Sequence, residues 1–446
     1  MRIGRRLGND AAIERFHKCG HVFRGSPRRG GPADVRPPSQ PVFSPGGTGR
    51  QGSGGPNAAS AASRYHAFRP SMRQQPVAEV VAGQRPTPQG AQGVDGPTVE
   101  WAFSPAISPA IREFHLNVNR ISVIIPLWNG EKLLGSLLDS LALQTLAPAE
   151  ILVVDNGSTD GAAALALRRG ARVISMGYNA GFAAAVNRGI AEVSGEWTAV
   201  LNTDVTLAPD YFERLTAHGA WFATGRILQQ HDPTRLDATF DLLSRAATSW
   251  RAGYGGPYGP AFQQARAIWS APWTAVLFRT EIFRRVGMLE ASFESYLEDV
   301  DFGLRSAALG FTGEYVAEAV AWHVGSASLG RWHPEVVRRT ARNQVFLLAR
   351  HYPQRLLLRW FWPILAGQLL WGLVALRHGA GLAWGRGKIE GLWRFRKLRA
   401  RSHPLPPQLL QDVIRPQERL LRELQPAVGA NLYWRLYFLL TASGAE

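Results

Sequence analysis

The chain has 446 residues, of which 46% are hydrophobic, and it carries a formal net charge of +16. This length exceeds one typical domain, so two or three segments are expected. The single cysteine, Cys19, excludes an internal disulfide framework and a thiolate metal site. Positive charge is concentrated at the ends: residues 1–118 hold 15 Lys and Arg against 7 Asp and Glu, and residues 346–446 hold 15 against 5. No nucleic-acid fold signature accompanies these basic ends, so we expect no nucleic-acid partner.

Residues 1–118 form the first segment of the chain. Gly, Pro, Ser, Arg and Gln dominate it, and no hydrophobic period lasts long enough to form a helix or strand. Such a composition cannot bury enough apolar surface to offset the entropy of ordering the chain. We therefore predict a disordered extension, and we assign it no function.

Ordered structure is expected to begin with a buried strand over 121–126, a β-branched run that ends in Pro126. Leucines at helical spacing follow it over 133–141. The same alternation then repeats, and strands that alternate with helices are typical of an open parallel α/β sheet. The further strands are predicted over 150–155, 172–175 and 198–201, with helices over 162–169 and 183–193.

Polar side chains follow three of these strands. Asn129, Asp155 and Asp204 each stand at the carboxyl end of a predicted strand. Ligands of open α/β sheets bind outside these ends, so the joint placement favours a binding site, although each residue alone could be a turn or cap residue. Asn202 and Asp204 also have the placing of oxygen ligands for Mg²⁺ or Mn²⁺ bound to a diphosphate.

The segment from 221 to 325 is harder to interpret. Strands are expected over 221–225 and 273–278, and an edge strand over 312–316. The Gly- and aromatic-rich stretch 253–260 could be a lid, an acceptor-binding loop or a plain surface loop. His323 follows an apolar run, and from the residues alone it is more readily a satisfied core histidine than a metal ligand.

An acidic cluster, Glu298, Asp299 and Asp301, is flanked by aromatic and aliphatic residues. Carboxylates that are crowded against apolar neighbours have raised pKa values, which is how a protein makes a general base that works near neutral pH. The alternative is a helix N-terminus, where the three carboxylates would complement the helix dipole.

The C-terminal segment combines apolar and basic stretches. Residues 356–376 contain only Arg359 and Gln368 as strongly polar residues, and as one helix they could span a bilayer or lie on it. Residues 384–401 interleave seven Lys and Arg with Trp393, Phe395 and Leu398, a pattern that favours a cationic helix on an anionic membrane surface. An ordinary helical subdomain packed on the preceding domain is the alternative.

Taken together, the motifs resemble an inverting glycosyltransferase of family 2 with the GT-A fold. More narrowly, they resemble the bacterial rhamnosyltransferase-like members that act on cell-surface polysaccharides. The resemblance spans 119–353, and it divides the chain into the extension 1–118, a GT-A domain over 119–353 and a helical, membrane-associated region over 354–446. The matching motifs are 123–130, 153–161, 179–183 with Asn187 and Gly189, 201–204, 298–301, His323, Arg342 with Asn343, and 350–353.

The resemblance implies roles for the residues that bind the donor, a nucleotide-diphospho-sugar. Pro126, Asn129 and Asp155 would line the nucleoside pocket, with Asp155 accepting a hydrogen bond from the base. Asn179 and Gly181 would border the nucleotide or the sugar.

The resemblance also implies roles for the metal and for the chemistry. Asp204, together with His323, would hold a divalent metal on the diphosphate. Asn202 replaces the first Asp of the D-x-D motif of many relatives, which removes one anionic ligand. Asp299 would be the general base, Glu298 would tune it or position the acceptor, and Asp301 would cap the following helix.

The implied activity is transfer of a sugar, with rhamnose as the candidate that the narrower resemblance suggests, to a hydroxyl of a cell-surface glycan or lipid-linked acceptor. The enzyme would work at the cytoplasmic face of the plasma membrane, either peripherally or through one membrane helix. Two alternatives remain: a non-catalytic, membrane-bound sugar-nucleotide-binding protein, and a sugar-phosphate nucleotidyltransferase. The second would need a Gly-rich phosphate loop with a basic residue after the first strand, which 126–130 does not supply.

Overall fold

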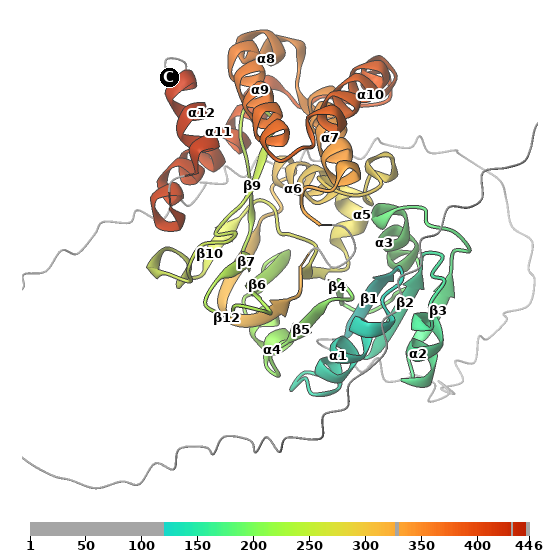
Figure 1. The fold of residues 1–446 in the computed structure, drawn as a ribbon. Helices are drawn as coiled ribbons and strands as arrows, with labels where there is room; N and C mark the ends of the chain where they lie inside the picture. Colours follow the sequence, from blue (N-terminus) through green and yellow to red (C-terminus); the bar gives the residue numbers. More distant parts are fainter. Residues whose placement is uncertain (1–119, 326–329, 430, 443–446) are drawn as a thin grey trace, which may run out of the picture. The chain divides into compact units, whose positions relative to one another are not determined.

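A computed structural model of the chain describes residues 120–325, 330–429 and 431–442. The predicted disordered extension, with Cys19, lies outside these residues. A ten-stranded sheet forms the centre of the described fold, and β8 and β9 form a separate two-stranded sheet (Figure 1). The strands are β1 (Ile121–Leu127), β2 (Glu150–Asp155), β3 (Arg172–Ser175), β4 (Trp197–Leu201), β5 (Val205–Leu207), β6 (Phe222–Gln229), β7 (Leu236–Ala238), β8 (Asp241–Leu243), β9 (Ser249–Arg251), β10 (Arg266–Ile268), β11 (Ala275–Arg279) and β12 (Gly313–His323).

The strand order along the large sheet is β10-β12-β6-β11-β4-β1-β2-β3, with β5 on β12 and β7 on β6. Strands β4, β1, β2 and β3 are parallel, as predicted. Strand β11 runs antiparallel between β4 and β6, and β6 and β12 are again parallel to each other. The predicted α/β fold, a sheet flanked by helices, is confirmed.

One strand differs from the sequence-based expectation. The edge strand predicted over 312–316 is part of the long strand β12, which pairs with β10 on one side and β6 on the other. A register shift between Val316 and Val320 interrupts its pairing with β6. Gly313 lies so close to Phe222 that a Cβ there would be 2.2 Å from the ring. Strand β12 is therefore an internal strand of the sheet. The alternation of apolar and polar residues in the sequence could not show whether the strand lies inside the sheet or at its edge.

Helices cover both faces of the sheet because alternate residues of its strands face opposite sides. Ile124 and Val154 belong to one core cluster with Val186 of α3, whereas Val123 and Leu137 of α1 belong to the other. Strands buried on both faces give the continuous apolar runs that the sequence shows. The helices of this part are α1 (Glu131–Ala142), α2 (Ala162–Arg168), α3 (Phe182–Ile190), α4 (Tyr211–Thr216), α5 (Ile282–Val286) and α6 (Glu298–Ala308), with short 3₁₀ turns at Pro260–Phe262 and Ala291–Phe293.

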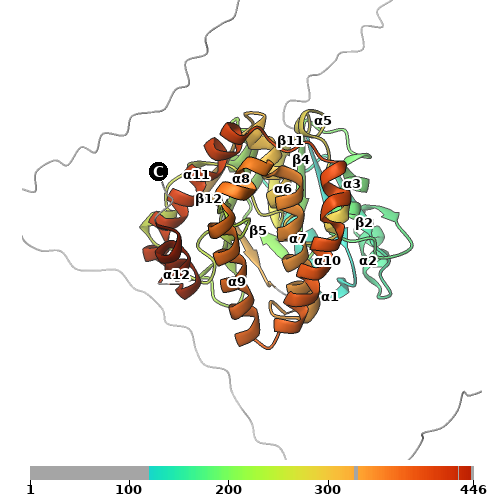
Figure 2. The same cartoon turned by 90° about the horizontal axis from the view of Figure 1, so that it is seen from above.

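The C-terminal part is helical, and Figure 2 shows its helices from above. Val300 and Leu304 of α6 share one core cluster with Phe346 of α7, Leu356 of α8 and Ile414 of α11. The helices therefore pack on the element that carries the acidic cluster. The predicted domain boundary at residues 353 and 354 falls between α7 and α8, and it stays a prediction. The helices are α7 (Pro334–His351), α8 (Gln354–Arg359), α9 (Phe361–Arg377), α10 (Gly381–Ala400), α11 (Pro407–Leu424) and α12 (Leu432–Thr441), with a 3₁₀ turn at Gln425–Val428.

The apolar stretch 356–376 does not form the single 21-residue helix that the sequence allowed. The chain breaks at Trp360 between α8 and α9, and α9 has 17 residues. Within residues 120–325, 330–429 and 431–442, no helix combines the length and the apolar character needed to cross a bilayer.

Candidate active site

The loops after β1 and β2 are joined by the residues predicted to bind a nucleoside. Asn129 adopts a left-handed backbone conformation with φ 52°. Its Oδ1 accepts a hydrogen bond from the Thr159 N–H at 2.8 Å, and its own N–H donates to Ser158 Oγ at 3.0 Å. Asp155, the last residue of β2, accepts from the Ser158 N–H at 2.9 Å through Oδ1. Pro126 lies half-buried in β1 opposite Val154. These side chains meet at the carboxyl edge of the parallel strands.

Asn179 and Gly181 form a second part of this edge. Asn156, the residue after β2, donates from Nδ2 to Asn179 Oδ1 at 3.1 Å and to the Gly181 carbonyl oxygen at 3.2 Å. Gly181 has φ 89°, and a Cβ there would lie 2.9 Å from the backbone of Glu294. Only glycine fits this conformation and this close approach. The loop that includes Asn179 therefore packs directly against the chain that leads into the acidic cluster.

Asp204 and His323 lie together, although 119 positions separate them in the sequence. His323 Nε2 is 3.1 Å from Asp204 Oδ1, and His323 Nδ1 is 2.8 Å from Asp237 Oδ2. Burial alone would lower the pKa of His323, but the hydrogen bonds to the two carboxylates raise this pKa to about 9. Asn202 is half-buried two residues before Asp204, and its N–H donates to the Thr274 carbonyl oxygen at 2.9 Å.

The chemistry of Asp204 and His323 fits a divalent metal. A carboxylate oxygen and an imidazole nitrogen are common metal ligands, and a carboxylate on the other ring nitrogen orients the histidine, as Asp237 does here. Within the part of the chain that the structure describes, no group of three or more His, Cys, Asp or Glu side chains is placed to hold a metal ion. Asp204 and His323 would therefore supply two ligands, and a bound diphosphate and water would have to provide the others.

The acidic cluster lies at the start of α6, after a segment with unusual backbone geometry. Glu294, Tyr296 and Leu297 all have positive φ angles, of 62°, 74° and 66°. Left-handed conformations are uncommon for such residues and persist only where the surroundings impose them. Here Asn343 of α7 donates from Nδ2 to three backbone carbonyl oxygens of the segment, and Arg342 donates to one of them. The distances are 2.9 Å from Asn343 to Phe293, 3.0 Å to Ser295 and 2.7 Å to Tyr296, and 2.9 Å from Arg342 to Phe293.

Glu298 is buried and Asp299 is half-buried, and the charge of Arg251 acts on both. Arg251 Nη2 is 4.0 Å from Asp299 Oδ2, while Asp299 Oδ1 accepts from the Val300 N–H at 2.8 Å. Burial and the charge of Asp299 hold the pKa of Glu298 well above its usual range. Burial also raises the pKa of Asp299, and the nearby Arg251 opposes that rise. Both groups are therefore more basic than ordinary carboxylates.

Asp301 differs from its two neighbours. Its fully buried carboxylate accepts hydrogen bonds from Arg305 Nε at 2.9 Å, Arg350 Nε at 2.9 Å and His351 Nε2 at 2.7 Å. Although burial opposes ionisation, Arg305, His351 and Arg350 hold the pKa of Asp301 far below its usual range. The expectation that Asp301 caps α6 misses this role, since the carboxylate joins α6 to α7.

Three residues of this region were missed by the sequence analysis: Asp237, Asp241 and Arg251. They come from the short strands β7, β8 and β9, within the segment that was hardest to interpret. Arg251 is close to Asp241 as well as to Asp299, and the charge of Asp237 also acts on it. The residues predicted to hold a metal, Asp204 and His323, and the predicted base Asp299 are thus connected through Asp237 and Arg251.

An α/β sheet with polar side chains at the carboxyl ends of its parallel strands, together with two carboxylates of raised pKa, is typical of a nucleotide-binding enzyme. The family model for glycosyl transferase family 2 matches residues 122–285. The chain is 31% identical over 222 residues to an N-acetylglucosaminyl-diphospho-decaprenol L-rhamnosyltransferase of Mycobacterium tuberculosis, an alignment that covers 44% of this chain and 72% of the relative. The chain belongs to glycosyl transferase family 2. The glycosyltransferase interpretation is therefore confirmed over the two alternatives.

Two further proteins extend the comparison. A PGL/p-HBAD biosynthesis glycosyltransferase of Mycobacterium bovis is 30% identical over 192 residues, which cover 41% of this chain and 68% of the relative. Among solved structures, one of GalNAc-T7 with UDP, GalNAc and Mn²⁺ is 15% identical. It superposes with a TM-score of 0.49 over 71% of this chain and 60% of the other.

Proposed function

We propose that this glycosyltransferase moves a sugar, L-rhamnose, from a nucleotide-diphospho donor to a hydroxyl of a lipid-linked or cell-surface glycan, with inversion at the anomeric carbon. The observation that carries the proposal is Asp299, a half-buried carboxylate of raised pKa at the start of α6, after the segment whose Glu294 packs against Gly181. The rhamnosyl specificity and the lipid-diphosphate acceptor rest on the relative from Mycobacterium tuberculosis.

Asp299 acts as the general base. Its Oδ1 accepts the Val300 N–H, which leaves Oδ2 to take the proton of the acceptor hydroxyl. The acceptor oxygen forms the new bond to the anomeric carbon, and the bond from that carbon to the phosphate oxygen breaks with its electrons leaving on the nucleoside diphosphate. One displacement from the face opposite the leaving group gives inversion. Burial raises the pKa of Asp299, which makes it a stronger base than an ordinary aspartate.

The donor is held at the carboxyl edge of the parallel strands. Pro126, Asn129 and Asp155 line the nucleoside side, and Asn179 and Gly181 border the sugar side. Asp204 and His323 would hold Mg²⁺ or Mn²⁺ on the diphosphate, next to Asn202. When bound, such a metal supplies stabilisation of the negative charge that grows on the leaving diphosphate.

The test is the variant Asp299→Asn, assayed with nucleotide-diphospho-L-rhamnose and an N-acetylglucosaminyl-diphospho-polyprenol. We expect transfer to fall by roughly 10²–10⁴-fold, the usual contribution of a general base. Binding of the donor, measured by thermal shift with Mn²⁺, should be retained. The matched control is Asp139→Asn, which removes an exposed carboxylate on α1. Transfer by Asp299→Asn at the rate of the control would rule out the proposed base.

We also propose that the enzyme works as a peripheral protein on the cytoplasmic face of the plasma membrane, through the surface of 356–401. Leu382, Ile389, Leu392 and Trp393 of α10 are exposed, Trp393 by 86%. The exposed cations Arg386, Arg394, Arg396 and Lys397 lie among them. Apolar side chains flanked by cations suit an anionic lipid surface.

Two of the seven cations predicted for this surface are used inside the protein instead. Lys388 donates from Nζ to the Ala341 carbonyl oxygen at 2.9 Å and to Gln344 Oε1 at 2.8 Å. Arg399 donates to the Ala349 carbonyl oxygen at 3.2 Å. Close approach of α10 to α7 at glycine positions brings these side chains into the interface.

Flotation with liposomes of phosphatidylglycerol and phosphatidylcholine tests the membrane proposal. The double variant Leu392→Ser and Trp393→Ser should weaken binding by about tenfold or more, because each apolar side chain contributes on the order of 1.5–3 kcal/mol when it is buried. Leu167→Ser, at an exposed leucine of α2, is the control. Equal flotation of both variants and the wild type would contradict the proposal.

A further inference from the structure

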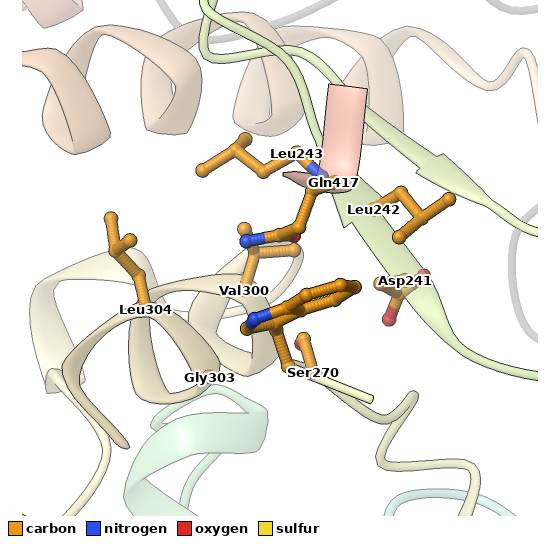
Figure 3. Close-up of a pocket in the computed structure, with 9 residues that line it drawn as sticks. Asp241, Leu242, Leu243, Ser270, Val300, Gly303, Leu304 and Gln417 are labelled. Carbon is orange, nitrogen blue, oxygen red and sulfur yellow. The ribbon is translucent and has the colours of Figure 1, made fainter. Parts of the chain in front are cut away.

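Asp241 is a buried carboxylate with ties to the catalytic helix that the proposed mechanism does not use. It lies on β8 directly opposite Arg251 of β9. Its N–H donates to the Ser270 carbonyl oxygen at 3.1 Å, and Ser270 Oγ donates to the Asp299 carbonyl oxygen at 3.3 Å. Figure 3 shows Asp241 and Ser270 at one side of a small cavity, with Val300 and Gly303 of α6 at another. Asp241 is therefore held in a fixed position relative to α6.

The two oxygens of Asp241 have different surroundings. Oδ1 is 3.7 Å from Arg251 Nε, whereas Oδ2 is buried and has no hydrogen-bond partner among the described residues. The same guanidinium reaches Asp299 Oδ2 at 4.0 Å. Arg251 thus lies between two carboxylates, at distances where the interaction with each is electrostatic. A buried, partly unsatisfied carboxylate costs stability, so its presence beside the proposed base indicates a role in the chemistry.

We infer that Asp241 is a positioning residue for the proposed base: it shares the Arg251 guanidinium with Asp299 and thereby sets how much positive charge acts on Asp299. This inference rests on the proposed function of Asp299. It assigns no contact with substrate to Asp241, which acts through Arg251 and through its own charge.

The charge of Asp241 changes near neutral pH. Burial, and then the negative charge of Asp299, raises the pKa of Asp241 to about 7. Below this pKa Asp241 is neutral, and Arg251 acts on Asp299 alone. Above it, ionised Asp241 takes a share of the guanidinium and repels the negative Asp299, which makes Asp299 a stronger base. The charged and titratable groups that act on Asp241 and Arg251 are Asp237, Tyr254, Glu298 and Asp299. From α11, the neutral Gln417 lines the same small cavity as Asp241.

The variant Asp241→Asn tests the inference, because asparagine has nearly the shape of a protonated aspartate. The assay is the pH profile of kcat/KM for rhamnosyl transfer by the full chain, with nucleotide-diphospho-L-rhamnose and N-acetylglucosaminyl-diphospho-polyprenol. The wild-type rate should rise through pH 7, and the variant should lack this rise. The ratio of wild type to variant should therefore grow by roughly three- to tenfold between pH 6 and pH 8, as expected for a base strengthened by about one pKa unit.

The variant Arg251→Gln provides a second measurement, in which the pKa of Asp299 should shift in the opposite direction from the shift in Asp241→Asn. Loss of the cation should raise the pKa of Asp299 and move the acidic limb of the profile to higher pH. Asp412→Asn, at an exposed carboxylate of α11, is the control and should follow the wild type at every pH. A purely structural defect in Asp241→Asn would lower the rate by the same factor at all pH values, and that result would overturn the inference. Absence of transfer by the wild type would instead refute the proposed function.

Discussion

The carboxylate of Asp301 offers the sharpest test of how α6 is fixed. The variant Asp301→Asn keeps the size of the side chain but removes a charge that is fully buried. Arg305, Arg350 and His351 lose their shared acceptor. Arg305 retains its hydrogen bonds to two carbonyl oxygens, and Arg350 retains Glu290, whereas His351 loses the bond at 2.7 Å. Removing one partner of a buried ion pair costs about 3–5 kcal/mol, so we expect a loss of about 4 kcal/mol.

Urea-induced unfolding followed by tryptophan fluorescence measures this loss as a lower midpoint at unchanged slope. The control is Asp210→Asn, which breaks an exposed pair with Arg214 on α4 and should cost below about 1 kcal/mol. If the two variants unfolded at the same urea concentration, the network around Asp301 would not stabilise the fold, and the reasoning would be refuted.

The carboxylate of Asp301 also makes the free energy of unfolding depend on pH. The folded-state pKa of Asp301 is depressed relative to the ordinary value of 3.8. Its contribution to stability is therefore fully present above that ordinary value, and it is lost as the pH falls toward the depressed pKa. The wild-type free energy of unfolding should decline more steeply than that of Asp301→Asn as the pH is lowered below about 5.

Three further predictions concern the backbone before α6 and the interior of the C-terminal helices. Asn343→Ala should destabilise the fold by about 2 kcal/mol in urea unfolding, since it leaves the carbonyl oxygens of Ser295 and Tyr296 without their side-chain donor at about 1 kcal/mol each, while that of Phe293 keeps Arg342; it should also lower kcat more than it changes the donor KM. Gly181→Ala should cost about 2 kcal/mol, because its left-handed backbone and the contact with Glu294 admit no Cβ; a wild-type urea midpoint would contradict this. Burial holds the pKa of Lys388 well below its usual range, so wild-type stability should rise with pH below pH 10.5, and Lys388→Met should remove that slope.

The sequence predicted the parallel half of the sheet because its strands are buried on both faces. In the sequence, such strands are unbroken runs rich in β-branched residues, and the short loops that follow them mark their ends. Asn129, Asp155 and Asp204 could therefore be placed at one edge before the structure was known. The pairing of His323 with Asp204 depended on the family resemblance, since nothing local distinguishes this histidine from a core residue.

The residues around Arg251 could not be predicted in this way. Strands β7, β8 and β9 have three residues each, too short to show alternation. Asp241 and Asp299 are far apart in sequence, and only the tertiary fold brings them to one guanidinium. Lys388 was placed on a surface because charged helical residues are usually exposed. Gly387 and Gly391, four residues apart on the same helix face, were the available signal that α10 approaches α7 closely.

Hydrogen bonds from Arg342 and Asn343 of α7 fix the backbone of the segment before α6. They limit how the chain can be shortened or recombined with a relative. The family match ends at residue 285, upstream of the acidic cluster, yet the backbone of that cluster depends on Arg342 and Asn343. A shortened chain that stopped after α6 would keep the loops of Asn129, Asp155 and Asn179, but it would lose the hydrogen-bond donors Arg342 and Asn343 that shape 293–297. In a chimera with a relative, α6 and α7 must therefore be inherited as one unit, whatever is exchanged beyond them.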